Sequence, residues 1–311
     1  MTTTPSEPIL HHYPNSPFAE KARLMLGCKR MAWRSVIIPM MMPKPDVVAL
    51  TGGYRKTPIL QIGADVYCDT ALIGRVLEAR QPRPALYPAA APLAPMLAHW
   101  ADQALFPCAV AWALQPAGVG LVMRDVAPEA LKAFAADRAA AGFRRVLFRD
   151  AAAQLQVHLA ALDAQLQRGG PWLLGAEVSI ADIAVAHPLW FIRLAPPVTG
   201  VIDQHRSLSV WLDRVLAFGH GTSSPLASDE ALAVAAGAGG HAPTAVGPDL
   251  GFAAGDPVSV AATDWAGDPV AGTLVGLSCD EIVVRRSDAR AGTVHVHFPR
   301  VGFQLKNETS A

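Results

Sequence analysis

The sequence lacks three features that mark whole classes of proteins: an excess of one charge, a long apolar run and paired cysteines. Lysine and arginine total 26 against 26 acidic residues, which argues against a nucleic-acid-binding protein, because such a protein needs a basic surface. There is no run of about 18 apolar residues, which excludes a membrane-spanning helix. The 4 cysteines are far apart, which argues against a disulfide framework. The first residues lack the basic-then-apolar order of a signal peptide, so we predict a cytoplasmic protein.

Residues 8–80 alternate between short apolar runs and segments with helical periodicity. The predicted elements are, in order, a strand over 9–12, a helix over 17–29, a strand over 33–38, a short helix over 44–50, a hairpin over 58–62 and 66–68, and a helix over 69–80. This order predicts an α/β domain.

The composition changes twice further along the chain. A proline-rich segment over 82–92 and a stretch rich in Gly, Ala and Pro over 237–248 are typical of linkers. Between them, Ala and Leu at helical spacing predict an all-α bundle, and beyond them short alternating runs predict a small all-β module of the SH3-like barrel type. We therefore predict three domains, over 1–82, 93–236 and 245–307.

The first strand–helix junction reads Ser16-Pro17-Phe18. Proline is favoured in the first helical turn because its missing N–H would have no partner there. Ser16 therefore precedes a helix N-terminus, where free backbone N–H groups and the helix dipole favour an anion such as a thiolate or a carboxylate.

Two further junctions fit either a structural or a binding role. Pro58 is the first residue of a predicted strand. An ordinary trans proline is permitted at a strand start, which is the structural interpretation. A cis bond would instead turn the backbone N–H and C=O of Thr57 toward a peptide-like ligand, and the motif alone does not decide between the two. Asp69-Thr70 forms an ordinary helix N-cap, which by itself is the favoured interpretation, or it also holds the charged end of a ligand.

Other polar residues are assigned structural roles. Ser179 and Asp182 have the spacing of a capping box at the start of a helix. His295 and His297 lie two residues apart on one strand face, where they are able to share a metal ion. A solvated strand face is favoured for them, and no metal site is predicted.

Taken together, the ordered motifs over roughly residues 8–220 resemble the glutathione S-transferase family. The motifs that carry the resemblance are Ser16-Pro17-Phe18 with Lys21 and Arg23, Thr57-Pro58-Ile59-Leu60, Asp69-Thr70-Ala71-Leu72-Ile73, and Ser179-Ile180-Ala181-Asp182. The resemblance implies a thioredoxin-like N-terminal domain, a helical domain, and glutathione as co-substrate in the cleft between them. Residues 245–305 fall outside it.

The resemblance also implies roles for individual residues. Ser16 would donate a hydrogen bond to the glutathione sulfur, with Tyr13 as the main alternative donor. The remaining residues that the resemblance brings to glutathione are Thr57 and the cis Pro58 at its cysteinyl backbone, Asp69 and Thr70 at its γ-glutamyl end, and Lys44 at its glycine carboxylate. Because serine replaces cysteine at position 16, disulfide exchange by this residue is excluded.

The function implied is attack of the glutathione thiolate on an electrophilic, apolar small molecule by a cytoplasmic homodimer. No nucleic-acid, membrane or metal partner is expected. We expect the pocket for the electrophile between residues 40–43 and the helical residues Trp100, Phe106 and Trp112. The alternative is a non-catalytic binding or scaffold protein that has kept the fold, since a fold alone does not establish an activity.

Overall fold

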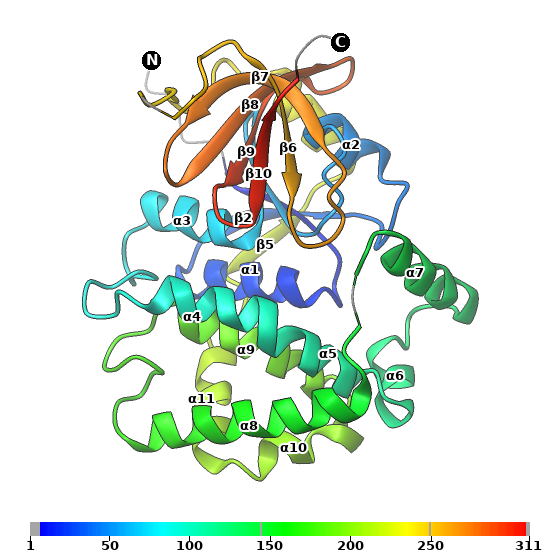
Figure 1. The fold of residues 1–311 in the computed structure, drawn as a ribbon, viewed down its shortest axis with the longest axis vertical. Coiled ribbons are helices and arrows are strands. Elements are labelled where there is room, and N and C mark those ends of the chain that lie inside the picture. The colour runs from blue at the N-terminus through cyan, green and yellow to red at the C-terminus, as the bar shows by residue number, and fades with distance from the viewer. Residues whose placement is uncertain (1–6, 144, 249, 309–311) are drawn as a thin grey trace.

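The computed structural model describes residues 7–143, 145–248 and 250–308 and consists of a sheet-containing half and a helical half (Figure 1). The elements of the N-terminal domain are β1 (Ile9–His12), α1 (Pro17–Cys28), β2 (Ala32–Ile37), α2 (Pro45–Thr51), β3 (Ile59–Ile62), β4 (Asp65–Cys68) and α3 (Thr70–Arg80). This is the predicted order, and it forms a thioredoxin-like domain.

The strands of this domain are held together around β1, which is buried on both faces. β1 pairs in parallel with β2 and antiparallel with β3, and β3 pairs antiparallel with β4. Leu10, Val36 and Leu60 are completely buried in this sheet. The apolar character of the short strands follows from this position, because a central strand has no solvent-facing side.

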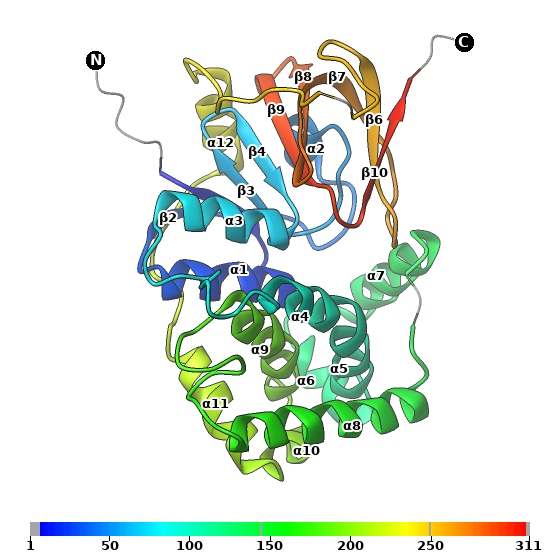
Figure 2. The same ribbon diagram turned by 60° about the vertical axis from the view of Figure 1, so that its left-hand side comes forward.

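The helical half lies below the sheet, with α1 and α3 on the side that faces it (Figures 1 and 2). Its elements are α4 (Ala94–Trp100), a π-helical turn η1 (Ala101–Leu105), α5 (Phe106–Ala113), α6 (Pro116–Val122), α7 (Pro128–Ala140), α8 (Phe148–Gln167), α9 (Ile180–Arg193), a 3₁₀ turn η2 (Pro196–Val198), α10 (Gly200–Asp203) and α11 (Arg206–Leu216). The last helix, α12 (Ser228–Ala236), lies in the sheet half (Figure 2). The central helix is α9, of which nearly every residue is buried. Prediction and structure therefore agree on a helical domain after residue 93.

The start of α9 carries the predicted capping box. The Oδ2 atom of Asp182 accepts hydrogen bonds from the backbone N–H of Ser179 at 2.9 Å and from its hydroxyl at 3.0 Å. The Oδ1 atom accepts from the Leu173 N–H at 2.8 Å and from the Trp211 indole N–H at 2.9 Å. One buried carboxylate thus joins the start of α9 to α11 and to the loop before α9.

The C-terminal strands extend the thioredoxin sheet. They are β6 (Pro257–Ala262), β7 (Val270–Leu277), β8 (Glu281–Asp288), β9 (Gly292–Pro299) and β10 (Phe303–Asn307), and we call residues 257–307 the extension. The 10-stranded sheet has the order β10-β6-β7-β8-β9-β4-β3-β1-β2-β5. The prediction of an SH3-like barrel is not confirmed, because the sheet stays open and β9 pairs in parallel with β4. An edge strand of the N-terminal domain is thereby covered.

Two further elements complete the sheet half. β5 (Thr222–Pro225) pairs with β2 in a segment where only helices were expected. Its four residues are exposed and have no apolar alternation, so no strand signal was present. Leu232 and Ala235 of α12 pack into the core that the sheet shares with the extension.

Among the described residues, no single helix is long and apolar enough to cross a membrane. One strongly bent pair, Ala94–Ala113 with Pro116–Val122, meets the length and composition criteria only when its two parts are taken together.

Candidate active site

A cavity of about 550 Å³ lies where the N-terminal domain, the helical half and the extension meet. Its size is typical of a small-molecule site. The predicted site residues that line it are Tyr13, Ser16, Thr57, Pro58, Asp69 and Thr70. Residues separated by more than 50 positions in the sequence are therefore brought to one cavity by the order of the strands in the sheet.

Ser16 occupies the N-cap of α1 at the cavity wall. Its Oγ accepts a hydrogen bond from the Ala19 N–H at 3.2 Å, and its residue is only 2% exposed. Across the described part of the chain, this hydroxyl donates no hydrogen bond to another residue, so its proton is available for a ligand. Tyr13 and Asn15 stand beside it, and the Asn15 amide donates to the Val122 carbonyl at 3.3 Å.

The Thr57–Pro58 peptide bond is cis, as one of the two interpretations of the sequence required. Both residues line the cavity. Lys44 does not belong to the described lining residues: it is 1% exposed, and its Nζ donates to the Thr57 Oγ1 at 2.9 Å and to the Arg55 carbonyl at 3.1 Å. Burial, with Arg138 and Arg55 nearby, lowers the pKa of Lys44 to about 7. In this arrangement Lys44 supports Thr57 from behind.

Asp69 and Thr70 stand at the start of α3. The Asp69 carboxylate caps the helix by accepting from the Ala71 N–H at 2.8 Å, with its backbone at φ 75°. Both residues and Ala71 line the cavity, so the helix N-cap also borders this space. The positive end of the α3 dipole therefore points toward the same space as that of α1.

The cavity wall contains an ion pair that the sequence did not lead us to expect. Lys21 of α1 and Asp102 of the π-helical turn are 2.6 Å apart, and both line the cavity. Burial raises the pKa of Asp102 to about 6, although Lys21 opposes this shift. His187 lies 3.9 Å from Asp102 and is kept neutral, since burial and Lys21 hold its pKa well below the usual value. The available signal was a single carboxylate in the apolar run after residue 93.

The extension supplies another wall of the cavity. Trp265, in the β6–β7 loop, makes cation–π contacts with two side chains. The Lys56 Nζ is 5.2 Å and the Arg138 guanidinium carbon 4.9 Å from its ring centroid. Lys56 also pairs with Asp264, and Ala266 donates a backbone hydrogen bond to the Ala141 carbonyl at 2.8 Å. The loop thus joins the N-terminal domain to the region of α7, which Figure 2 shows beside the ends of β6 and β10.

The apolar part of the cavity agrees only in part with expectation. Met40 and Phe106 line it. Trp100 and Trp112 are not among the described lining residues; Trp100 packs against His158, and Trp112 stacks on Phe148. Trp100, Phe106 and Trp112 are spaced six residues apart, and residues at this spacing on a helix point in different directions. Periodicity alone did not show which of the three faces the cavity in this bent segment.

Comparison with known proteins agrees with this geometry. The family description "Glutathione S-transferase, N-terminal domain" matches residues 10–85, and "Glutathione S-transferase, C-terminal domain" matches residues 133–214. A GST-like protein from Pseudomonas syringae is similar in structure, with 46% identity, a TM-score of 0.81, and coverage of 97% of this chain and 100% of that one. Among curated proteins none matches the chain.

More distant structures show the fold alone. Glutathione S-transferase III in its apo form is 20% identical, with a TM-score of 0.53 over 68% of this chain and 92% of that one. FzlA from C. crescentus is 24% identical, with a TM-score of 0.51 over 79% of this chain and 100% of that one. The match to the P. syringae protein covers 97% of this chain and therefore includes the extension.

A thioredoxin-like domain followed by a helical domain, with a cavity between them, defines the glutathione S-transferase class of proteins. The chain belongs to the glutathione S-transferase family.

Proposed function

We propose that the protein is a glutathione transferase, in which the thiolate of bound glutathione attacks an electrophilic carbon of an apolar small molecule. The observation that carries this proposal is the convergence of Ser16, Thr57-Pro58 and Asp69-Thr70 on one cavity. The sulfur–carbon bond forms while the leaving group departs with its electron pair, and the thiol proton passes to water. Ser16 stabilises the thiolate, which is the nucleophilic form.

Glutathione fits the polar side of the cavity. The N-termini of α1 and α3 favour anionic groups, which the sulfur and the carboxylates of glutathione provide. The Asp69 carboxylate, of which only one oxygen is used in capping α3, offers the second to the γ-glutamyl ammonium. Lys44 is placed behind Thr57, so in this proposal it orients Thr57 rather than contacting the glycine carboxylate.

The electrophile occupies the apolar side, between Met40, Phe106 and Val110 and the extension residues Trp265 and Phe303. The extension in this proposal shapes the second-substrate pocket, because its β6–β7 loop closes one end of the cavity.

The proposal is tested by measuring how tightly the Asp69→Asn variant binds glutathione. Asparagine caps a helix as well as aspartate does, so the variant removes the charge and keeps the fold. We expect calorimetry to show that glutathione binds the variant about tenfold more weakly, the size of one charge-assisted hydrogen bond. Cysteinylglycine, which lacks the γ-glutamyl group, should bind wild type and variant alike.

Three outcomes would contradict parts of this proposal. If wild-type protein shows no saturable glutathione binding, the transferase proposal fails. If Asp69→Asn weakens cysteinylglycine as much as glutathione, Asp69 does not contact the γ-glutamyl end. Binding without turnover of any electrophile supports a glutathione-binding scaffold.

Replacing Trp265 by alanine tests the role of the extension. We expect S-hexylglutathione to bind about tenfold more weakly, because its alkyl chain loses apolar contact area. Unsubstituted glutathione should keep its affinity, which calorimetry with both ligands measures. Equal losses for the two ligands would show that Trp265 only supports the cavity.

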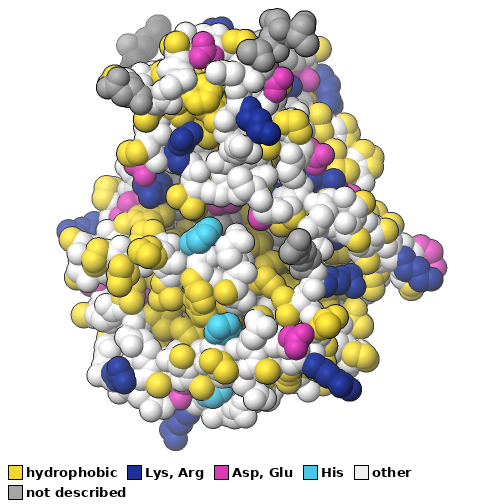
Figure 3. Space-filling view, in the orientation of Figure 1, with side chains coloured by type: hydrophobic (Ala, Val, Ile, Leu, Met, Phe, Trp, Pro, Cys, Tyr) yellow, Lys and Arg dark blue, Asp and Glu magenta, His cyan; other side chains and the backbone are white. Residues whose placement is uncertain are grey.

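The homodimer and the cytoplasmic location stay predictions. Apolar side chains gather over the helical half of the face in Figure 3, which supports an interface there. The molecular mass in solution and cell fractionation test the two predictions.

A further inference from the structure

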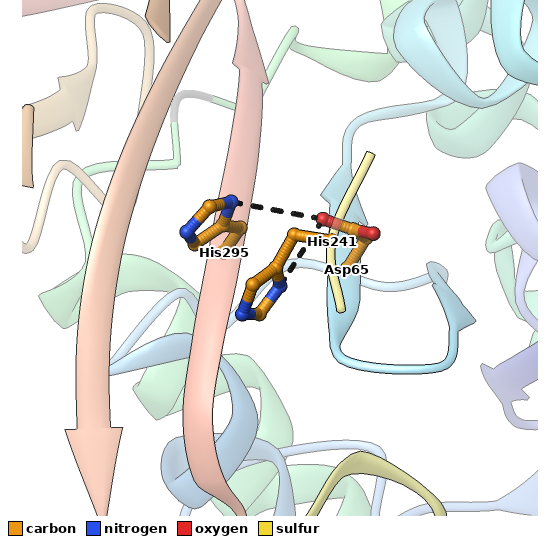
Figure 4. Close-up of side chains that lie close together, drawn as sticks. All are labelled: Asp65, His241 and His295. Carbon is orange, nitrogen blue, oxygen red and sulfur yellow. Dashed lines mark ion pairs between the residues drawn. The ribbon is translucent and has the colours of Figure 1, made fainter. Parts of the chain in front are cut away.

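One carboxylate and two imidazole side chains lie close together where the extension joins the N-terminal sheet (Figure 4). Asp65 of β4 and His295 of β9 are direct register partners in the parallel pair. His241 comes from the Gly-rich segment after α12, which is fixed to the same carboxylate because the Ala242 N–H donates to the Asp65 Oδ2 at 2.8 Å. The expectation of a solvated strand face is therefore wrong for this part of β9.

The ring nitrogens are aimed at one carboxylate oxygen without bonding to it. The Nδ1 atoms of His241 and His295 lie 3.6 Å and 3.9 Å from the Asp65 Oδ1. Both nitrogens are buried and have no hydrogen-bond partner among the described residues. Buried polar atoms are normally paired, so two adjacent unpaired nitrogens need an explanation.

The spacing suits ligands of a single ion. The three ligand atoms lie within 4.8 Å of one another. Two ligands of a tetrahedral zinc ion at normal bond lengths are about 3.3 Å apart, and they separate further at wider angles. Distances of 3.6 and 3.9 Å are too long for hydrogen bonds but close to this value.

A neighbouring network holds the carboxylate in place. The His297 Nε2 lies 3.0 Å from the Asp65 Oδ1, and its Nδ1 lies 2.8 Å from the Glu281 Oε1. His297 is 1% exposed, so the imidazole that joins the two carboxylates is screened from water. Ligating carboxylates in metal sites are usually oriented by such outer hydrogen bonds.

We propose that Asp65, His241 and His295 bind one divalent cation of the zinc type. Two imidazoles and one carboxylate suit zinc among the biological divalent metals, and the partly exposed side at His241 leaves room for a water ligand. The two imidazole rings are stacked, with centroids 3.6 Å apart, so binding requires the His241 ring to rotate until the ion lies in its plane. The glycines before His241 allow that adjustment.

The ion has a structural task in this proposal. None of the three ligands belongs to the described residues that line the cavity. They come instead from β4, from the segment after α12 and from β9, so the ion fastens the extension to the N-terminal domain. This inference is independent of the proposed transferase activity.

Zinc titration of the full chain, without an added histidine tag and with Cys279→Ser to remove the exposed thiol, tests the proposal. We expect one zinc ion per chain by calorimetry and a higher thermal unfolding temperature with zinc, since a ligand that binds only the folded state stabilises it. Co²⁺ should give visible absorption bands of a low-coordinate site. His241→Ala and His295→Ala should each weaken zinc binding at least tenfold.

His205→Ala, at a histidine outside the cluster, is the matched control and should bind zinc as the parent protein does. His241 lies on an irregular segment, so its replacement leaves the strands intact and separates ligand loss from misfolding. The proposal is overturned if the parent binds no zinc, or if the double variant His241→Ala/His295→Ala retains the stoichiometry and affinity of the parent.

Discussion

Replacing Ser16 by alanine should raise the thiol pKa of bound glutathione by about 1–2 units, and slow thiolate transfer at neutral pH about 10- to 100-fold. A hydrogen bond to a charged group contributes about 1.5–3 kcal/mol, and one pKa unit corresponds to about 1.4 kcal/mol. Ser16 is the residue expected to provide this bond because it lines the cavity and its hydroxyl accepts, but does not donate, a hydrogen bond within the described chain. The ultraviolet absorbance of the thiolate, followed against pH, measures the effect directly.

Two further variants separate the chemistry from the fold. Ser16→Ala also removes the cap of α1, whereas Ser16→Gly loses the hydroxyl but costs only a few tenths of a kcal/mol as a cap. Both should therefore show the same pKa rise. Ser224→Ala, at an exposed strand position, should leave the pKa unchanged. If Tyr13→Phe raises the pKa and the Ser16 variants do not, Tyr13 is the sulfur partner.

Replacing Asp182 by alanine should destabilise the helical domain by about 3–5 kcal/mol. The side chain is completely buried and accepts hydrogen bonds from three residues, Leu173, Ser179 and Trp211. Removing one partner of a buried, charge-assisted network leaves the remaining donors unsatisfied, which costs more than the bonds themselves contribute.

Thermal unfolding followed by circular dichroism checks this prediction, and a fall of about 10 °C is expected for a domain of this size. Asp182→Asn keeps one carbonyl acceptor, so it should fall between wild type and Asp182→Ala. Asp125→Ala, at an exposed carboxylate, should change the unfolding temperature little. An unchanged temperature in Asp182→Asn and Asp182→Ala would show that the network contributes nothing to stability.

The local elements of the N-terminal domain could be predicted because their signals lie within a few residues. The Ser16-Pro17 junction, the turn after Ile62 and the Ser179–Asp182 cap each depend on neighbours in the sequence. Their order was then enough to indicate the family, although each motif by itself fitted a purely structural role.

The cavity walls could not be predicted in the same way. Asp102 meets Lys21 from a π-helical turn, and nothing in the spacing of the sequence indicated that turn. Lys44 is a second case in which packing, and not local sequence, set the contacts of a side chain. Its position suited a ligand contact, but packing turned its ammonium group toward Thr57.

The sequence by itself determined the strands and helices of the N-terminal domain and which residues stand at the helix N-termini, since periodicity and capping act over one or two turns, but it did not indicate β5. Only the tertiary structure decided what the C-terminal strands do. Alternation in β9 was compatible with closing a small barrel or with pairing to β4, because a strand edge carries no side-chain signal that names its partner. The choice of β4 placed Asp65 opposite His295, gave the cavity its third wall and joined the extension to the N-terminal domain in one sheet.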